Sequence, residues 1–224
     1  MGIGTLSEKS LHAALKERFA RPGDLLEDKV DGYVVDIVRD GRLIEIQTGG
    51  FSGFKAKLAN LLPRHPVHII YPVVAKRECV RLRADGSVAG RRRSPKRRGV
   101  LDGLGELAPI SPLLMDPNLT VEIVLVREEL ATVDDGLGSW RRRGVSVADR
   151  KLLGVEGSIV LASLADYRRL LPRGLHESFT VRELADAAKC PVAVAGKAAY
   201  ALRRAGVIRV AGKRVNALVY EIVP

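Results

Sequence analysis

The sequence predicts an α/β fold, in which a mixed β-sheet is flanked by helices and is followed by a smaller helical unit that ends in a β-hairpin. Three observations predict it. Two short apolar runs are joined by Asp40-Gly41, a strong hairpin signal, and an amphipathic segment stands on either side of them. A continuous apolar run, Val67–Val74, has the pattern of a buried strand. Residues 163–224 have the patterns of three helices followed by a β-hairpin.

Length and composition limit the possibilities. The chain has 224 residues, which suggests one or two domains. Hydrophobic residues make up 46% of the chain and aromatic residues only 4%, so aliphatic side chains must fill the core.

The net charge favours a polyanionic partner. Lys and Arg number 37 against 26 Asp and Glu, a formal charge of +11. A basic surface of this size attracts nucleic acid, so DNA is the expected partner. An acidic membrane surface is less favoured because the sequence has no long basic amphipathic helix.

Cysteine use and the lack of apolar segments predict a cytoplasmic location. Cys79 and Cys190 are far apart and form no CxxC pair, which argues against a disulfide framework or a zinc ribbon. Residues 1–19 are charged, unlike a signal peptide. No apolar run approaches the roughly 18 residues of a membrane span, so no membrane association is expected.

The first elements follow from capping and periodicity. Thr5 or Ser7 can cap a helix through Phe19, with Leu11 and Leu15 on its apolar face. A hairpin over 32–47 comes next, and Ser52 can then cap a second helix through Leu62. A further hairpin is expected where 78–82 and 87–90 flank Ala84-Asp85-Gly86.

The middle of the chain is less legible. Residues 119–126, 145–148 and 158–162 have strand patterns, the last two around a glycine-containing turn. They either extend the first sheet or form a small separate domain. We therefore divide the chain into 1–99, an unassigned 100–162, and 163–224.

The last 62 residues predict a winged helix-turn-helix domain. A helix over 163–171 is followed by one that Thr180 caps and by a third that ends near Gly206. A β-hairpin closes the chain. Helix, turn, helix and hairpin in this order are typical of a winged helix, which docks on DNA or, alternatively, contacts proteins.

Two carboxylates face each other across the first hairpin. If Asp40 and Gly41 are the turn residues, Asp36 lies opposite Glu45, and Gln47 shares their face. Two like charges about 5 Å apart among apolar neighbours are unfavourable, and a divalent cation between them removes the repulsion. Mg²⁺, or Mn²⁺ in its place, takes oxygen ligands of this kind. The alternative is an exposed hairpin face with solvated charges.

This order of helix, hairpin with Asp-(8 residues)-Glu-x-Gln, helix and strand resembles the PD-(D/E)XK nuclease superfamily, the restriction-endonuclease-like fold, over roughly residues 1–90. The resemblance implies that Asp36 and Glu45 are metal ligands. It places Gln47 where the family usually has a lysine that positions the attacking water. Glu8 matches an accessory acidic residue on the first helix of many members.

The resemblance also implies a function, a Mg²⁺-dependent endonuclease that hydrolyses phosphodiester bonds in DNA. Gln47 departs from the usual lysine, and Lys55 or Lys57 on the second helix could restore the cation. His12 shares a helix face with Glu8 and either assists the site or forms a plain helix-surface pair. One alternative is a non-catalytic DNA-binding protein, with a regulatory role and an inactive nuclease-like domain, and another is a protein-interaction adaptor. A homodimer is possible because nucleases that cut both strands often pair.

Basic residues gather in two places that could contact DNA phosphates. The first is an extended arm after the sheet, and the second is the third helix and the hairpin tip of the winged helix. The alternative for the arm is a solvated loop. The predicted nucleic-acid-binding residues are Arg91, Arg92, Arg93, Lys96, Arg97, Arg98, Lys197, Arg203, Arg204, Lys213 and Arg214.

Overall fold

The computed structural model describes residues 6–140 and 143–224, with the backbone alone for 6–9. The helices, including the 3₁₀ helix η2, are α1 (Leu6–Phe19), α2 (Lys55–Leu61), α3 (Val100–Glu106), η2 (Ala108–Leu113), α4 (Leu164–Arg168), α5 (Val181–Ala188) and α6 (Val192–Arg204). The strands are β1 (Leu25–Val30), β2 (Tyr33–Arg39), β3 (Arg42–Ile46), β4 (Val67–Leu82), β5 (Val88–Arg93), β6 (Leu119–Asp134), β7 (Val145–Leu161), β8 (Ser178–Thr180), β9 (Ile208–Arg214) and β10 (Ala217–Ile222).

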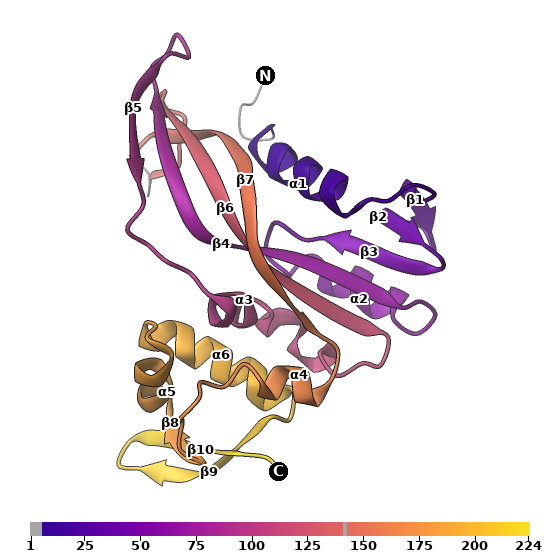
Figure 1. Ribbon diagram of the computed structural model, residues 1–224, viewed down its shortest axis with the longest axis vertical. Coiled ribbons are helices and arrows are strands. Elements are labelled where there is room, and N and C mark those ends of the chain that lie inside the picture. The colour runs from indigo at the N-terminus through magenta and orange to yellow at the C-terminus, as the bar shows by residue number, and fades with distance from the viewer. Residues whose placement is uncertain (1–5, 141–142) are drawn as a thin grey trace.

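A mixed seven-stranded sheet organises the molecule (Figure 1). Its order is β1-β2-β3-β4-β6-β7, and β5 pairs with the far half of β4. β3, β4 and β6 are parallel neighbours, whereas the pairs at the two ends of the sheet are antiparallel. The predicted α/β class with a mixed sheet flanked by helices is confirmed.

Helices cover both faces of the sheet. Leu11 and Leu15 of α1 are fully buried against one face, in a cluster with Ile37, Ile44 and Ile70. α2, α3 and η2 pack on the other face, where Leu58 and Leu104 join a larger cluster around Leu43, Ile69 and Ile123. Successive apolar side chains of β3 and β4 therefore pack into the clusters on opposite faces of the sheet.

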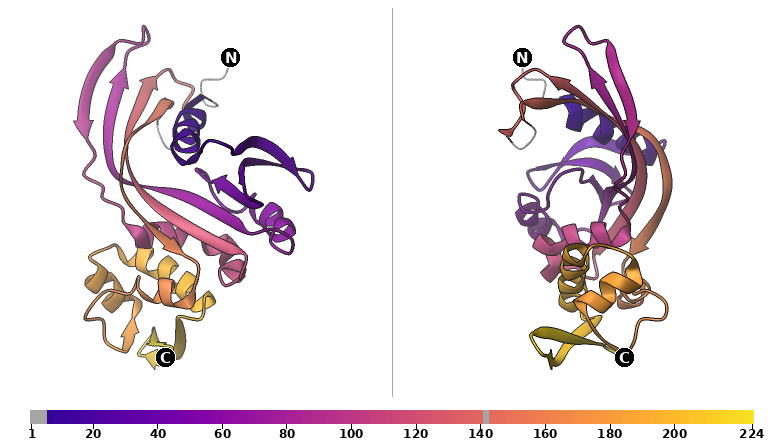
Figure 2. Two further views of the ribbon diagram at one scale, coloured as in Figure 1. Left: turned by 45° about the vertical axis from the view of Figure 1, so that its right-hand side comes forward. Right: turned by 90° about the vertical axis from the view of Figure 1, so that its left-hand side faces the viewer.

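β4 and β6 are long and curved, and their far ends rise beyond the rest of the sheet (Figure 2). β4 joins two segments, 67–74 and 78–82, that the sequence analysis treated as separate. β3 pairs with its first part and β5 with its last, so residues 71–77 of β4 lack a partner strand on that edge. An extra residue, Ala75, interrupts the register with β6 at this point.

The middle region extends the first sheet, because β6 and β7 pair with β4 and with each other. The predicted turn between 145–148 and 158–162 is wrong, since β7 runs without a break from Val145 to Leu161. Three register shifts against β6 absorb the glycines that suggested a turn.

Two further expectations need correction. α2 begins at Lys55 after Phe54, so Ser52 does not cap it, although Phe54, Leu58 and Leu61 are buried as expected. Arg91–Arg93 belong to β5 and not to a free arm, because Cys79 and Val80 of β4 pair with Arg92 and Arg91. The extended segment is limited to 94–99.

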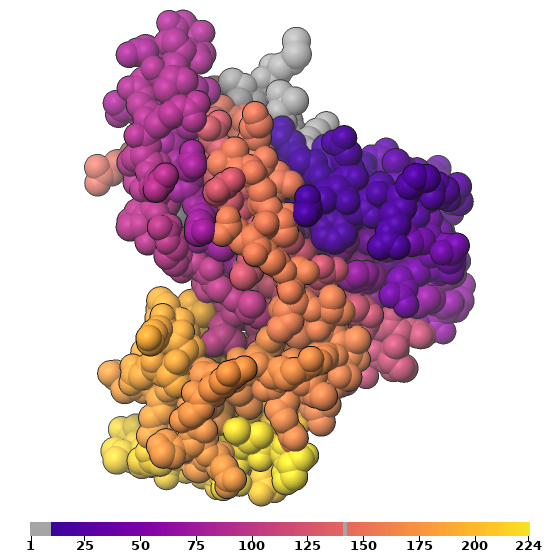
Figure 3. Space-filling view, viewed as in Figure 1, coloured from indigo at the N-terminus to yellow at the C-terminus, as the bar shows by residue number. Residues whose placement is uncertain are grey.

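Residues 163–224 fold as a separate lobe below the large sheet (Figure 3). Ser163 caps α4 and Thr180 caps α5, each in a reciprocal capping box. β8, β10 and β9 form a three-stranded sheet in that order. α6 packs against α3 and η2, so the lobe and the large sheet share one core cluster.

No helix among the described residues is long and apolar enough to cross a membrane.

Candidate active site

The β2–β3 hairpin has the predicted turn. Asp40 and Gly41 both have positive φ, 47° and 78°, as a tight two-residue hairpin turn requires. The register follows, with Arg39 opposite Arg42 and Ile37 opposite Ile44. The paired ladder ends at Ile37 and Ile44, so Asp36 and Glu45 are not a hydrogen-bonded cross-strand pair.

Asp36 lies where β2 departs from β3. Its neighbours Val35 and Ile37 pack into different core clusters, so the strand turns at this residue. Oδ2 of the Asp36 carboxylate accepts a 2.8 Å hydrogen bond from the amide of Ile46 on β3. Oδ2 also lies 3.2 Å from Nε2 of His12 on α1.

Asp36 and His12 support each other's charged forms. Burial pushes the pKa of Asp36 upward, but hydrogen bonds from His12 and the Ile46 amide outweigh it and hold this pKa below its ordinary value. The same hydrogen bond raises the pKa of His12 above its ordinary value. The pair therefore carries opposite charges over a wider pH range than either residue would alone.

Glu45 is the buried member of the site. Glu45 is only 6% exposed to solvent, and burial raises the pKa of its carboxyl group to about 7. Nζ of Lys57, on α2, lies 2.5 Å from Oε1 of Glu45 and donates a 2.6 Å hydrogen bond to the carbonyl of Val34. Lys57 thus ties α2 to both strands of the hairpin and offsets part of the cost of burying Glu45.

The two carboxylates belong to one electrostatic cluster. The charge of Asp36 contributes to the raised pKa of Glu45, and the charge of Glu45 contributes to the raised pKa of His12. Lys57 acts on both acids. The sequence analysis weighed His12 and Lys57 only as accessories, because nothing in the sequence shows how α1 and α2 fold over the hairpin.

Of the two other predicted catalytic residues, the structure describes only the side chain of Gln47, which stands apart from this cluster. The side-chain amide of Gln47 donates a 2.8 Å hydrogen bond to the carbonyl of Gly50, which engages it in the loop after β3. Glu8 belongs to the first turns of α1, but its side chain lies outside the described residues. Lys55 is exposed, and Lys57 supplies the cation next to Glu45.

The cluster offers two carboxylates, those of Asp36 and Glu45, to a cation. The described part of the chain contains no group of three or more His, Cys, Asp or Glu side chains that could hold a metal. Mg²⁺ is usually bound by only one or two carboxylates, with substrate phosphates and water completing its shell. Oδ2 of Asp36 and Oε1 of Glu45 have protein partners, so Oδ1 and Oε2 are the oxygens that Asp36 and Glu45 can offer.

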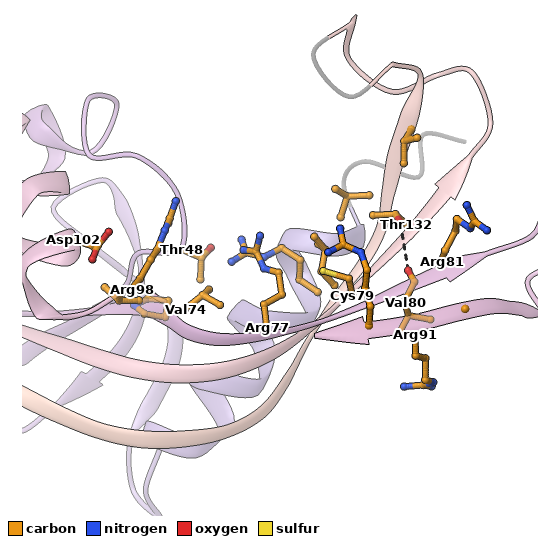
Figure 4. A pocket seen from close by; sticks show the side chains of 18 of the residues that line it. Thr48, Val74, Arg77, Cys79, Val80, Arg81, Arg91, Arg98, Asp102 and Thr132 are labelled. Carbon is orange, nitrogen blue, oxygen red and sulfur yellow. Dashed lines mark hydrogen bonds between the residues drawn. The ribbon is translucent and has the colours of Figure 1, made fainter. Parts of the chain in front are cut away.

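A basic groove begins beside the site. Thr48, which directly follows Gln47, lines one end of a cavity of about 930 Å³. The cavity passes the open edge of β4 and continues over β4, β5, β6 and β7. Figure 4 shows Thr48 and Arg98 at one end, Arg77 near the middle, and Cys79 and Thr132 toward the other end.

The predicted basic arm contributes only part of this groove. Arg92 and Arg98 line it, whereas Arg91 points to the other side of the strands (Figure 4) and forms a 2.6 Å ion pair with Glu129. Arg93, Lys96 and Arg97 are exposed but lie outside its lining.

The sequence analysis missed three of the arginines that line the groove, Arg77, Arg81 and Arg150. The spacing of Arg77, Cys79 and Arg81 along β4 is a strand signal that could have found two of them, since alternate residues share a face.

The basic residues of the C-terminal lobe occupy different settings. Lys197 lies at the contact between α6 and α3, with Nζ 3.7 Å from Glu106 and its Cβ against Gly105. Arg203 and Arg204 are exposed at the end of α6. At the β9–β10 tip Lys213 is exposed and Arg214 pairs with Glu183 at 2.8 Å.

Comparison with protein families gives one match, which covers residues 9–162 and is described as "Domain of unknown function (DUF8091)". The chain belongs to the DUF8091 family. The DUF8091 match begins within α1 and ends one residue after β7, so it contains the large sheet and the Asp36–Glu45 cluster.

The chain is also similar to a curated protein. An "Uncharacterized protein" of Treponema pallidum (strain Nichols) is 35% identical over 186 residues, which cover 83% of this chain and 74% of the relative. No solved structure gives a significant match.

Proposed function

We propose that this protein is a metal-dependent nuclease that hydrolyses phosphodiester bonds in DNA. The observation that carries the proposal is the cluster of Asp36, Glu45, Lys57 and His12, which combines two partly buried carboxylates with two basic groups. Its place, on a hairpin between two helices, agrees with the resemblance to PD-(D/E)XK nucleases.

Each side chain has a part in the proposed reaction. Asp36 and Glu45 would hold Mg²⁺ through Oδ1 and Oε2. When bound, the ion would lower the pKa of a coordinated water and stabilise charge that develops on the phosphate. Lys57 keeps Glu45 in place and supplies the positive charge that Gln47 cannot. His12 fixes Asp36 by the hydrogen bond to Oδ2.

The raised pKa of Glu45, about 7, fits this use. A cation that binds next to Glu45 competes with a proton, so the carboxylate is available to metal without being a permanently buried charge. The pKa of Glu45 stays raised although Lys57 lies next to it. A second positive charge at the site would therefore stabilise the ionised Glu45 carboxylate further.

We further propose that residues 163–224 form a winged helix that contacts DNA. The order of α4, β8, α5, α6 and the β9–β10 hairpin supports this. The DNA contact would come from the exposed Lys197, Arg203 and Arg204 of α6 and from Lys213 and Arg214 at the hairpin tip. Two of these residues also have acidic neighbours, because Lys197 lies near Glu106 and Arg214 pairs with Glu183.

A cleavage assay tests the nuclease proposal. Plasmid, branched and single-stranded DNA are incubated with Mg²⁺ or Mn²⁺ and with wild-type protein, Asp36→Asn or Glu45→Gln. We expect metal-dependent cleavage that either substitution reduces by about 100-fold or more. The matched control is Glu129→Gln, which removes a carboxylate of β6 and should cut normally. Cleavage that survives both Asp36→Asn and Glu45→Gln would overturn the proposal.

One observation favours the second candidate, a non-catalytic DNA-binding protein with an inactive nuclease-like domain. Lys57 already contacts Glu45, and an ion pair can replace a bound metal as the partner of a buried carboxylate. In that case DNA binding should persist in Glu45→Gln, and no substrate should be cut by the wild-type protein with either metal.

A further inference from the structure

The groove that begins at Thr48 is strongly basic. Six arginines and two acidic residues line it, and one of the six, Arg91, points to the other side of the strands and pairs with Glu129. The acids are already engaged, since Asp102 accepts a hydrogen bond from the Gly99 amide and Glu106 lies near Lys197. The positive charge of the groove is therefore in excess, and a ligand that balances it must be anionic.

Two of these arginines, Arg77 and Arg150, form ion pairs with one buried carboxylate, that of Glu128. Glu128 on β6 is 0% exposed, and its Oε1 accepts a 2.5 Å hydrogen bond from Nε of Arg77 on β4. Its Oε2 accepts from Nε and Nη2 of Arg150 on β7, at 3.1 and 3.0 Å. Glu128 thereby fixes the direction of two guanidinium groups and leaves their other N–H donors for a ligand.

The three other arginines of the groove are free to bind. Arg81, Arg92 and Arg98 make no hydrogen bond or ion pair with a described residue, and all three are exposed. Arg92 and Arg150 share a face because Arg92, Cys79, Leu130 and Arg150 are in register across β5, β4, β6 and β7. Three strand spacings separate them by about 14 Å.

The volume and the lining of the groove indicate which polyanion it binds. A cavity of about 930 Å³ has room for a few linked nucleotides of a single strand. Tyr71 is the aromatic residue in the described lining, so charge and not base stacking dominates. Such a groove binds with little regard to base sequence.

We propose that this arginine groove binds one single strand of nucleic acid through its phosphates and delivers that strand to the Asp36–Glu45 pair. Thr48 lines the groove and lies three residues after Glu45 in the chain, which places the end of the β2–β3 hairpin at the groove. The delivery step rests on the proposed nuclease function, whereas the binding step does not.

Binding is measured by fluorescence anisotropy with a labelled oligothymidylate in EDTA, so that no cleavage occurs. The test variant is the triple substitution Arg81→Ala, Arg92→Ala and Arg98→Ala. The matched control is Arg18→Ala, Arg42→Ala and Arg173→Ala, which removes the same charge from exposed positions outside the groove. Circular dichroism melting confirms that both variants fold.

Counterion release sets the expected effect. Three lost phosphate contacts should lower the slope of log affinity against log salt by about 2, which is about 100-fold in affinity at 0.1 M salt. The control triple should bind within a few-fold of the wild-type protein. Equal losses in both triples, or none in the groove triple, would overturn the inference.

Two competitors complete the test. Duplex DNA should compete more weakly than the single strand for the groove, and polyglutamate of equal charge should compete weakly. Equal competition by either would show another occupant and overturn the single-strand assignment. The outcome is separable from the nuclease test, because a protein that cuts nothing can still lose single-strand binding in the groove triple alone.

Discussion

At the scale of single residues, the site depends on how burial and ion pairing oppose each other. Asp36 and Glu45 are both partly buried acids, yet hydrogen bonds lower the pKa of Asp36 while burial raises that of Glu45 to about 7. Divergent pKa values in neighbouring acids are typical of functional sites. The difference arises because Asp36 accepts from His12 and a backbone amide, whereas Glu45 has Lys57 as its principal partner.

The raised pKa of Glu45 predicts a pH-dependent stability. The folded protein holds this proton up to about pH 7, whereas the unfolded chain releases it near pH 4.5, so the folded state is favoured at low pH. As the pH rises from 4.5 to 7, the Glu45 side chain should lower the unfolding free energy of the metal-free protein by up to about 3 kcal/mol. Urea denaturation in EDTA at pH 4.5, 6 and 7.5 measures this.

Glu45→Gln should remove that decline, so its stability relative to wild type should improve as the pH rises. Glu122→Gln is the control. Because a hydrogen bond from His68 lowers the pKa of Glu122, the charged Glu122 side chain stabilises the folded protein as the pH rises, which is the opposite of the effect of Glu45. A wild-type profile that matches the Glu45→Gln profile across this range would show that Glu45 titrates normally.

At the scale of helices and strands, α3 packs between the large sheet and the C-terminal lobe and connects the two. A Cβ on Gly103 would lie 2.7 Å from Cγ2 of Val73 and 2.9 Å from Cγ2 of Ile123, on the large sheet. A Cβ on Gly105 would lie 2.9 Å from Cβ of Lys197 on α6. The two glycines let one short helix approach the sheet on one side and α6 on the other.

Gly103→Ala should therefore destabilise the protein. Overpacking costs about 1–3 kcal/mol, and the better helix propensity of alanine returns at most about 1. Gly196→Ala in α6 is the matched control, because its Cβ would meet its nearest neighbour at an ordinary 3.7 Å. Thermal melting should show a lower midpoint for Gly103→Ala and an unchanged or higher one for Gly196→Ala. The reverse order would contradict this packing.

The elements that sequence predicted well are those with local signals. Asp40-Gly41 determines the β2–β3 register because both residues adopt positive φ, and Thr180 caps α5 because its side chain accepts from the Glu183 amide. β1 and α3 were missed, since their residues have neither clear periodicity nor a clear cap.

Long-range contacts explain the rest of what sequence could not show. Pairing of β4 with β5 holds Arg91–Arg93 in a strand, and the fold of α1 and α2 over the hairpin brings His12 and Lys57 to the carboxylates. These are tertiary effects, and no local pattern in one sequence encodes them.

At the scale of the whole molecule, the triad of Arg77, Glu128 and Arg150, with Glu128 fully buried, connects stability to the groove. It joins β4, β6 and β7. Glu128→Gln would leave two arginines without their counter-charge and should cost about 3 kcal/mol of unfolding free energy. Chemical denaturation of Glu128→Gln and of the neighbour Glu129→Gln checks this.

Glu129 pairs with the exposed Arg91, so Glu129→Gln should cost at most about 1 kcal/mol. Similar losses in the two variants would show that the triad does not hold the sheet together. A loss confined to Glu128→Gln would identify the triad as the support of the arginine groove.

The central claim is that Asp36 and Glu45 jointly hold a divalent cation next to a nucleic acid strand. Its most direct test is the anomalous scattering of Mn²⁺ in crystals of the protein grown with a short oligothymidylate. The account predicts one manganese peak bridged by the Asp36 and Glu45 carboxylates, with a phosphate of the bound strand on the same ion. An oligonucleotide seated in the crystal while Lys57 alone contacts Glu45, with no manganese at the pair, would contradict it.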